Sequence, residues 1–172
     1  MIIEILLFLV TLGADQLLKY WTRMQIVVPG DTRPLLGNVL AFQYAQNFGT
    51  PDQVSFIRGR SVFMNIVRLL QVVFIVYLLV FQRKKLARIT RLGLILFLSG
   101  LIGNQIDYFV RGFVTDMFYV PFWSRSPIFN VADVCVLVGM AIILVRVAFF
   151  EGQEWMNHVF EKKEKKNEEF GK

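Results

Sequence analysis

The stretch LGLILFLSGLIGNQIDYFV, residues 92–110, is predominantly apolar and carries Asn104 and Asp107 near its end. About 20 apolar residues are needed to cross the hydrocarbon core of a bilayer, so this stretch is close to the length of a membrane span. A carboxylate at membrane depth is unfavourable and usually serves a function. The stretch therefore predicts a membrane-spanning helix with functional polar groups near one end.

Three further apolar runs, residues 2–21, 61–81 and 128–150, reach a similar length. The chain of 172 residues is 55% hydrophobic and 15% aromatic, more than the core of a soluble domain of this size requires. We therefore predict an all-α membrane protein, a four-transmembrane-helix bundle that forms a single transmembrane domain over residues 1–150. Residues 151–172 are a charged tail, expected to be a short interfacial helix with a solvated end.

The first run could instead be a secretory signal peptide, because residues 2–14 are a short apolar stretch that ends in small residues. It lacks a basic start, however, and carries Glu4 there. Apolar residues also resume after Asp15. We therefore interpret this run as a membrane span.

Basic residues indicate the orientation of the spans. The short link 83–91 contains five of them among nine residues, whereas the longer segment 22–60 contains only four. Cytoplasmic loops are enriched in Lys and Arg, so the short link and both termini should be cytoplasmic. This topology accounts for the net charge of +6, and the sequence contains no motif that would read a nucleic acid.

This topology brings polar residues from three spans to one depth, near the outer face of the membrane. They are Asp15 and Lys19 of the first span, Asn104 and Asp107 of the third, and Asn130 and Asp133 of the fourth. Asp116 follows the third span in the link 112–127, whose aromatic residues suit the membrane interface. A site built from these groups would lie at the outer headgroup boundary, within reach of a membrane-anchored substrate.

The outer segment 22–60 is too long for a simple turn. It alternates weakly between apolar and polar residues around Gly37–Tyr44, and Pro29-Gly30-Asp31 and Thr50-Pro51-Asp52 are typical of turns. We predict a small extracytoplasmic β-like cradle here, between the first and second spans.

Five short polar motifs lie along the chain. They are Asp15-Gln-Leu-Leu-Lys19, Asn47-Phe-Gly49, Gly103-Asn104-Gln-Ile-Asp107, Gly112-Phe-Val-Thr-Asp116 and Phe129-Asn130-Val-Ala-Asp133. Their order and spacing resemble those of the bacterial lipoprotein signal peptidase family, signal peptidase II, over nearly the whole chain except the charged tail. One such motif alone would be unspecific, whereas five in order across the predicted spans are specific.

The resemblance implies an aspartic endopeptidase of the bacterial inner membrane, which removes the signal peptide of prolipoproteins on the amino side of a diacylglyceryl-modified cysteine. By their places in the motifs, Asp116 and Asp133 would be the catalytic pair. Two neighbouring carboxylates do not both ionise easily, so they share one proton and titrate as a pair. The charged partner can take a proton from water while the neutral one donates to the scissile carbonyl or leaving amine.

The resemblance also implies substrate-binding and supporting residues around the pair. These are Asp15, Lys19, Asn47, Gly49, Asn104, Asp107 and Asn130. Expected partners are prolipoprotein substrates, membrane lipids and globomycin-type cyclic peptide inhibitors, and the protein should act as a monomer. No metal or other cofactor is expected, because the one histidine, His158, lies in the tail and the one cysteine, Cys135, fits a small apolar helix position.

The chain departs from the family pattern at three places. Tyr108 stands where the family carries Arg, Thr50-Pro51 and a longer stretch before Phe56 replace small residues and an earlier Phe, and Met117 stands where Phe is usual. The first departure predicts the loss of an ion pair, and the second a reshaped substrate flap. None of them touches the predicted catalytic pair.

The same residues could instead have purely structural roles, each indicated by a local sequence pattern. They are an N-cap for Asn130 and Asp133, an ion pair for Asp15 and Lys19, close helix packing at Gly100 and Gly103, a turn at Asn47 and a solvated helix end at Asp107.

Two other functions would also suit a small membrane protein. A proton- or cation-coupled transporter would place carboxylates inside a bundle, but such proteins show internal repeats and broken helices that this sequence lacks. A non-catalytic assembly subunit would not need several carboxylates at one depth. The depth of the carboxylates discriminates, because clustering at the outer edge favours hydrolysis and placement at the midplane favours transport.

Overall fold

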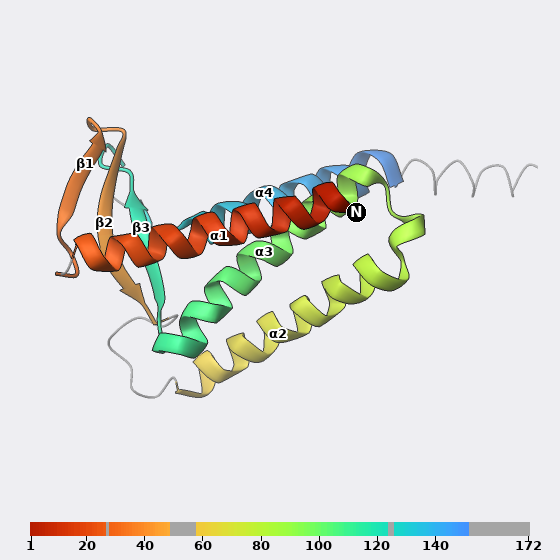
Figure 1. Ribbon diagram of the computed structural model, residues 1–172, viewed down its shortest axis with the longest axis horizontal. Helices are drawn as coiled ribbons and strands as arrows, with labels where there is room; N and C mark the ends of the chain where they lie inside the picture. Colours follow the sequence, from red (N-terminus) through yellow and green to blue (C-terminus); the bar gives the residue numbers. More distant parts are fainter. Residues whose placement is uncertain (27, 49–57, 124–125, 152–172) are drawn as a thin grey trace, which may run out of the picture.

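The computed structural model describes residues 1–26, 28–48, 58–123 and 126–151, without the side chains of residues 58–64 and 150–151. Long helices lie along one direction and a three-stranded sheet stands at one end of them (Figure 1). The helices are α1 (Ile2–Gln25), α2 (Arg58–Phe81), α3 (Arg88–Arg111) and α4 (Val131–Arg146). A short 3-10 turn, Arg83–Lys85, follows α2, and a π-helical turn, Val147–Glu151, follows α4.

The burial pattern of α1 is the one expected of a helix that faces lipid. Its buried residues are all polar: Glu4, Asp15, Lys19 and Thr22. Large apolar side chains lie on the outside instead, and Leu17 is 70% exposed. Apolar side chains are stable against hydrocarbon, whereas polar groups there must be satisfied inside the protein. The inverted pattern therefore indicates a membrane environment.

Two helices in the described part of the chain are long and apolar enough to cross a membrane. They are α3, Arg88–Arg111, and the helical stretch Val131–Phe149, which contains α4. The described apolar part of α2, Asn65–Phe81, is shorter. The predicted helical membrane protein is confirmed at this level, and the small β structure predicted beside the helices is a three-stranded sheet.

A small apolar core joins α2 to α3. Ile75 of α2 and Leu94, Leu98 and Leu101 of α3 are buried and lie in one cluster. Partly buried apolar side chains of α1 and α4 pack around this cluster. The contact fixes which face of α2 is turned toward the other helices.

Glycines allow α3 to approach its neighbours closely. A Cβ on Gly100 would collide with the carbonyl oxygen of Ala132 in α4. A Cβ on Gly103 would lie 2.7 Å from Oδ2 of Asp15 in α1. Small residues at helix contacts in membranes let two backbones pack against each other. The packing role predicted for Gly100 and Gly103 is confirmed.

We expect Gly100→Ala to lower the free energy of unfolding by about 1–3 kcal/mol, because the added methyl group overpacks the contact with α4. Gly13→Ala in α1 is the matched control, since no atom lies within 4 Å of a Cβ at that position. The control should leave stability unchanged or raise it by roughly 0.5–1 kcal/mol. Thermal unfolding in detergent micelles, followed by circular dichroism, compares the variants, and equal melting of the two would contradict the close contact.

The sheet is antiparallel, with the strand order β1-β2-β3. β1 (Thr32–Leu36) and β2 (Leu40–Asn47) form a hairpin within the segment where the sequence predicts a small sheet. β3 (Val114–Tyr119) comes from the link between α3 and α4, where no strand is predicted. It pairs with β2 so that Asp116 lies opposite Ala45. The unpredicted third strand thus carries a candidate catalytic residue.

Several predicted helix boundaries are corrected. α3 begins at Arg88 rather than at residue 92, inside the predicted basic link, and α4 ends at Arg146 rather than at residue 150. α1 continues past Trp21 to Gln25. α4 begins at Val131 rather than at residue 128, because Phe129 pairs with Phe118 in a β-bridge and the helix then starts from an N-cap. Several predictions concern residues outside the described ranges: Gly49, the Thr50-Pro51-Asp52 turn, Phe56 and the tail with His158.

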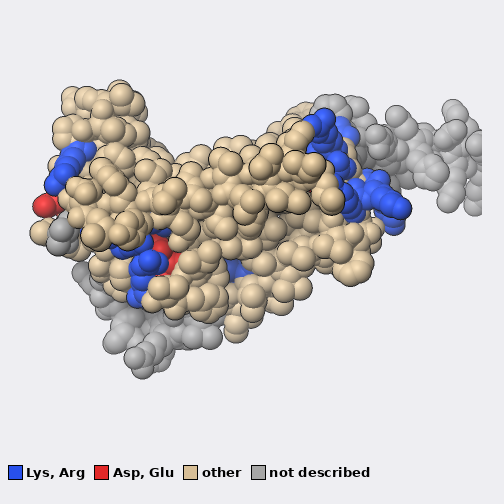
Figure 2. Space-filling model, in the orientation of Figure 1, with Lys and Arg blue, Asp and Glu red and all other residues tan. Residues whose placement is uncertain are grey.

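Basic side chains gather at the end of the helices opposite the sheet (Figure 2). Glu4 of α1 is buried there, where it accepts a hydrogen bond from Nε of Arg91 at 2.8 Å and pairs with Arg83 at 2.6 Å. This cluster connects the start of α1 to the basic link between α2 and α3. The link is thereby fixed to one end of the helix bundle.

Candidate active site

Asp116 lies in β3 and is only 3% exposed. The side-chain amide of Asn130 donates to its Oδ1 at 2.6 Å, and that of Asn47, at the end of β2, donates to its Oδ2 at 3.0 Å. Pairing of β2 with β3 brings Asn47 to the carboxylate, and the start of α4 brings Asn130. Both oxygens of Asp116 therefore accept hydrogen bonds, which fixes the plane of the carboxyl group. The turn suggested for Asn47 is replaced by a strand end.

Asp133 lies in the first turn of α4. Its Oδ1 accepts a hydrogen bond from the side-chain amide of Asn104 at 2.8 Å, and its Oδ2 accepts one from the backbone nitrogen of Asn130 at 3.1 Å. The backbone nitrogen of Asp133 donates in return to Oδ1 of Asn130 at 2.9 Å, which completes a capping box. The predicted N-cap is confirmed, and it also holds the carboxylate in place.

Asn130 connects the two carboxylates. Its Oδ1 caps α4 beside Asp133, while its Nδ2 donates to Asp116. The side chain is fully buried, so it does not exchange these partners for bulk water. One amide group therefore sets the relative position of both carboxylates.

A small cavity adjoins Asp133. It has a volume of about 50 Å³, and its lining is mostly polar. The lining residues are Asn47, Arg68, Asn104, Tyr108, Val114 and Asp133. A water molecule needs roughly 10–15 Å³ of such space and several polar partners, so the cavity is large enough to hold water beside Asp133.

Burial and, next, the charge of Asp133 raise the pKa of Asp116 from 3.8 to about 6. Hydrogen bonds from Asn47 and Asn130 and the charge of Lys19 oppose this shift. The influence of one carboxylate on the other requires the two to lie near each other. The arrangement suits a pair that holds one proton at mildly acidic pH.

The raised pKa of Asp116 predicts that stability depends on pH. Between pH 3.8 and about pH 6, Asp116 of the folded protein keeps a proton that the unfolded chain releases. Protonated Asp116 therefore stabilises the folded state fully below the pKa of the unfolded chain. This stabilisation is lost as the pH rises through the pKa of the folded protein, and the change is on the order of 3 kcal/mol. Asp116→Asn does not titrate, so its melting temperature should rise relative to that of the unsubstituted protein between pH 4 and pH 7.

Exposed Asp31 provides the control for this titration. Asp31→Asn should melt in parallel with the unsubstituted protein over the same pH range. Melting temperatures measured in one detergent at each pH compare the three proteins. A constant difference between Asp116→Asn and the unsubstituted protein would contradict the raised pKa.

Lys19 is a fully buried cation that connects α1 to the carboxylate pair. Its Nζ lies 2.8 Å from Oδ2 of Asp15 and donates to Oδ1 of Asn104 at 2.8 Å. Because Lys19 occupies the oxygen of Asn104, the NH₂ group of that amide is turned toward Asp133. The predicted ion pair is confirmed, and it orients a hydrogen-bond donor toward a candidate catalytic carboxylate.

Asp15 also reaches α4. Its Oδ1 accepts a hydrogen bond at 2.9 Å from the backbone nitrogen of Ala132, one of the N–H groups that the first turn of a helix leaves without a partner in the helix. Gln16 donates to Oδ2 of Asp15 at 3.0 Å and to the carbonyl oxygen of Gly103 at 2.9 Å. α1 therefore contacts both helices whose ends form the site.

Asp107 is fully buried, so the suggested solvated helix end is wrong. It accepts hydrogen bonds from the backbone nitrogen of Thr115 at 2.8 Å and from Arg111 at 2.6 Å. Arg23 lies 3.5 Å from the same carboxylate and donates to Oγ1 of Thr115 at 2.8 Å. These contacts anchor β3 one residue before Asp116.

Three members of this support, Arg23, Arg111 and Thr115, were not among the residues predicted from the sequence. Arg111 follows Asp107 by four residues on one helix, a spacing that predicts an ion pair and could have identified it. Arg23 and Thr115 carry no such local signal, because their contacts join α1 and β3 to α3.

Comparison with known proteins decides the family. A family model described as "Signal peptidase (SPase) II" matches residues 7–149. The chain belongs to the signal peptidase II family. It is 36% identical over 150 residues to the lipoprotein signal peptidase of Clostridioides difficile (strain 630), covering 87% of this chain and 97% of that protein. It is 34% identical over 151 residues to the lipoprotein signal peptidase of Latilactobacillus sakei subsp. sakei (strain 23K), covering 88% and 97%.

Two solved structures, each described as a bacterial membrane enzyme, share the fold. One aligns with a TM-score of 0.74 at 22% identity, over 86% of this chain and 93% of the other. The second aligns with a TM-score of 0.72 at 23% identity, over 84% and 86%. Membership in the signal peptidase II family makes the protein an aspartic-type peptidase, a hydrolase of lipoprotein maturation.

The departures from the signal peptidase II pattern can be located in this fold. Tyr108 lines the small cavity. Tyr108 in place of the family's arginine was expected to remove an ion pair. Asp107 nevertheless forms ion pairs with Arg111 and Arg23. Met117 is fully buried.

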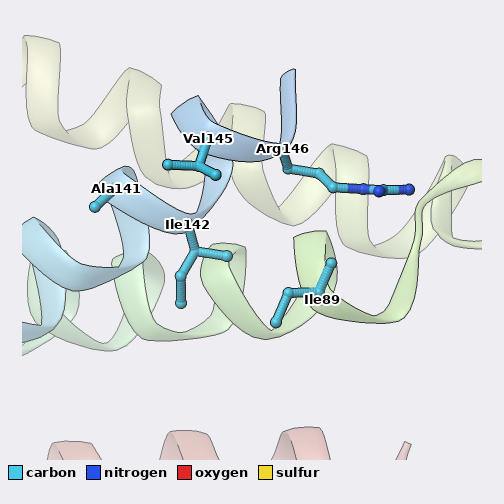
Figure 3. A pocket seen from close by; sticks show the side chains of 5 residues that line it. All are labelled: Ile89, Ala141, Ile142, Val145 and Arg146. Carbon is cyan, nitrogen blue, oxygen red and sulfur yellow. The ribbon is translucent and has the colours of Figure 1, made fainter. Parts of the chain in front are cut away.

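A larger cavity, of about 430 Å³, lies at the other end of α4, away from the aspartates of the signal peptidase II motifs. Its lining residues are Ile89, Ala141, Ile142, Val145 and Arg146 (Figure 3). The described walls are apolar apart from Arg146 and contain no carboxylate, thiol or imidazole. The larger cavity therefore offers no acid or base for peptide hydrolysis.

The side chains that donate to Asp116 and Asp133 are the amides of Asn47, Asn104 and Asn130. Within the described ranges, no group of three or more His, Cys, Asp or Glu side chains could hold a metal ion. The residues at this site of the signal peptidase II fold are suited to proton transfer with water.

Proposed function

We propose that the protein is a membrane endopeptidase that removes signal peptides from diacylglyceryl-modified prolipoproteins, with Asp116 and Asp133 as its catalytic pair. The observation that carries this proposal is the link through Asn130, which hydrogen-bonds to Asp116 and caps the helix turn of Asp133, beside a small polar cavity that Asp133 lines. The relatives named as lipoprotein signal peptidases supply the substrate class.

The mechanism follows from the different surroundings of the two carboxyl groups. Asp116 holds the shared proton, because its pKa is raised to about 6. Asp133 takes a proton from water while the water oxygen bonds to the scissile carbonyl carbon, and Asp116 donates its proton to the carbonyl oxygen. The C–N bond of the resulting diol then breaks: the amine takes the proton from Asp133, and a diol hydroxyl returns one to Asp116.

We place the site at the outer boundary of the bacterial inner membrane, with α1 to α4 as four spans in one domain over residues 1–150. The basic end of the bundle, opposite the sheet, faces the cytoplasm together with both termini (Figure 2). The carboxylates lie at the sheet end rather than at the middle of the helices, which favours hydrolysis over coupled transport. We expect the protein to act as a monomer.

The sheet serves as a cradle for the substrate in this arrangement. Leu36 and Val39, at the tip of the β1-β2 hairpin, are 62% and 60% exposed. Apolar side chains at the sheet end suit contact with the headgroup region, where a lipid-anchored substrate arrives. Asp116 belongs to β3 of this sheet and lies opposite Ala45 of β2, so a substrate on the cradle would lie close to it.

Incubation of the purified protein with a diacylglyceryl-modified prolipoprotein and its unlipidated counterpart tests the proposal. We expect cleavage of the lipidated substrate only, on the amino side of the modified cysteine, and inhibition by globomycin. Cleavage of both substrates at equal rates would contradict the lipid requirement. No cleavage by folded protein would contradict the proposed function.

A further inference from the structure

Arg68 is a charged residue in the apolar part of α2, Asn65–Phe81, where every other residue is uncharged. It lies seven residues before Ile75, two helical turns along the same face, and Ile75 packs against α3. Arg68 is half-buried and lines the small cavity together with Asn104, Tyr108 and Asp133. A charge on a helix in a membrane normally faces the protein interior and has a function.

No strong structural partner accounts for this guanidinium. Among the described residues, its hydrogen bond is a long one, 3.5 Å, to Oδ1 of Asn65. No described carboxylate forms an ion pair with it, whereas Arg23, Arg91 and Arg111 each lie beside one. Arg68 therefore has donors to offer to whatever enters the cavity.

Asp116 has polar partners of its own. The cation that opposes the raised pKa of Asp116 is Lys19, together with hydrogen bonds from Asn47 and Asn130. The free donors of Arg68 therefore point to an interaction with substrate rather than with the catalytic acid.

We propose that Arg68 is a substrate-positioning residue whose guanidinium donates hydrogen bonds to main-chain carbonyl oxygens of the peptide beside the scissile bond. An extended peptide presents such oxygens as neutral acceptors, and a guanidinium offers several donors in a fixed plane. The cavity thus receives its cation from α2, while Tyr108 occupies the position where the family pattern carries arginine. This inference rests on the proposed function and adds a residue outside the five sequence motifs.

Steady-state kinetics of Arg68→Gln, Arg68→Lys and Arg88→Gln on a lipidated prolipoprotein test the inference. Arg88 is exposed at the opposite end of the bundle and serves as the matched control. We expect Arg68→Gln to lower kcat/KM by about 10- to 100-fold, as loss of a charged hydrogen bond does, chiefly through a higher KM. Arg68→Lys should recover part of the loss, and Arg88→Gln should leave activity unchanged.

Two further measurements separate positioning from a structural role. The pH profile of kcat should stay in place in Arg68→Gln, and the melting temperature should remain within about 2 °C. A shifted profile or a large loss of thermal stability would instead assign Arg68 to the electrostatics or the packing of the site. Activity of Arg68→Gln within threefold of the unsubstituted enzyme would overturn the inference.

Binding distinguishes failure of the inference from failure of the proposed function. A fluorescent diacylglyceryl-modified peptide is titrated into Asp133→Asn protein, with and without Arg68→Gln, and the two dissociation constants are compared. Binding that weakens at least tenfold in the double variant supports the inference even where the unsubstituted protein shows no cleavage. Equal binding by both proteins, or no binding by either, would overturn it.

Discussion

Asp133→Asn and Asp116→Asn should each reduce cleavage of a lipidated prolipoprotein by about a thousandfold or more. General acid–base catalysis typically contributes about a hundredfold to ten-thousandfold. An amide resembles a carboxylate in shape but neither takes a proton from water nor shares one with a neighbouring carboxylate. The measurement is single-turnover cleavage with enzyme in excess, which reports the chemical step directly.

The two variants should also melt differently. Both oxygens of Asp133 accept hydrogen bonds, so an amide there turns an NH₂ group toward the NH₂ of Asn104 or the backbone N–H of Asn130. We expect a loss of about 1–3 kcal/mol for the donor left unsatisfied in Asp133→Asn. Asp116→Asn also leaves a donor unsatisfied. Near neutral pH, however, this loss of stability is offset because the substitution removes a buried charge.

Asp31→Asn is the control for both experiments, since Asp31 is exposed in the turn before β1. It should cleave and melt like the unsubstituted protein. Cleavage within tenfold of normal by either Asp116→Asn or Asp133→Asn would remove that residue from the catalytic pair. Complete unfolding of a variant would be visible in its circular dichroism and would separate structural loss from chemical loss.

Lys19→Met should lower the free energy of unfolding by about 3–5 kcal/mol, because it leaves the carboxylate of Asp15 buried without its cation. It should also reduce cleavage, since Asn104 loses the donor that turns its NH₂ group toward Asp133. Thermal unfolding in detergent and single-turnover cleavage measure the two effects separately.

The double variant Asp15→Asn/Lys19→Met tests the reason for this loss. The asparagine oxygen can still accept the hydrogen bond from Ala132, and no buried charge remains. We therefore expect the double variant to recover most of the stability of Lys19→Met but little of the activity. Lys85→Met, at an exposed basic position, is the control and should change stability by less than about 0.5 kcal/mol. Normal melting of Lys19→Met would show that the ion pair contributes nothing.

Local spacing was sufficient where two residues share one helix. Asp15 and Lys19 stand four apart and pair, and Asn130 and Asp133 stand three apart and cap α4. Helical geometry alone brings such residues together. For Asn130 and Asp133, the structural role and the proposed catalytic one proved compatible, because the cap holds the carboxylate.

Contacts across elements were not predictable in this way. The link after α3 was expected to be an aromatic interface segment, yet it forms β3 because β2 offers it a partner. The support of Asp107 by Thr115 and Arg23, and the placing of Arg68 in the cavity, depend likewise on how separate elements lie against one another.

The sequence by itself determined the membrane character, the long helices and the local pairs, because apolar length and helical spacing are properties of neighbouring residues. The tertiary structure alone decided which polar groups meet. Close packing at Gly100 and Gly103 sets the register of α1, α3 and α4, and this register brings Asp15 to Ala132. Pairing of β2 with β3 brings Asn47 to Asp116. Such contacts depend on the shapes of two surfaces at once, and no single stretch of sequence contains both.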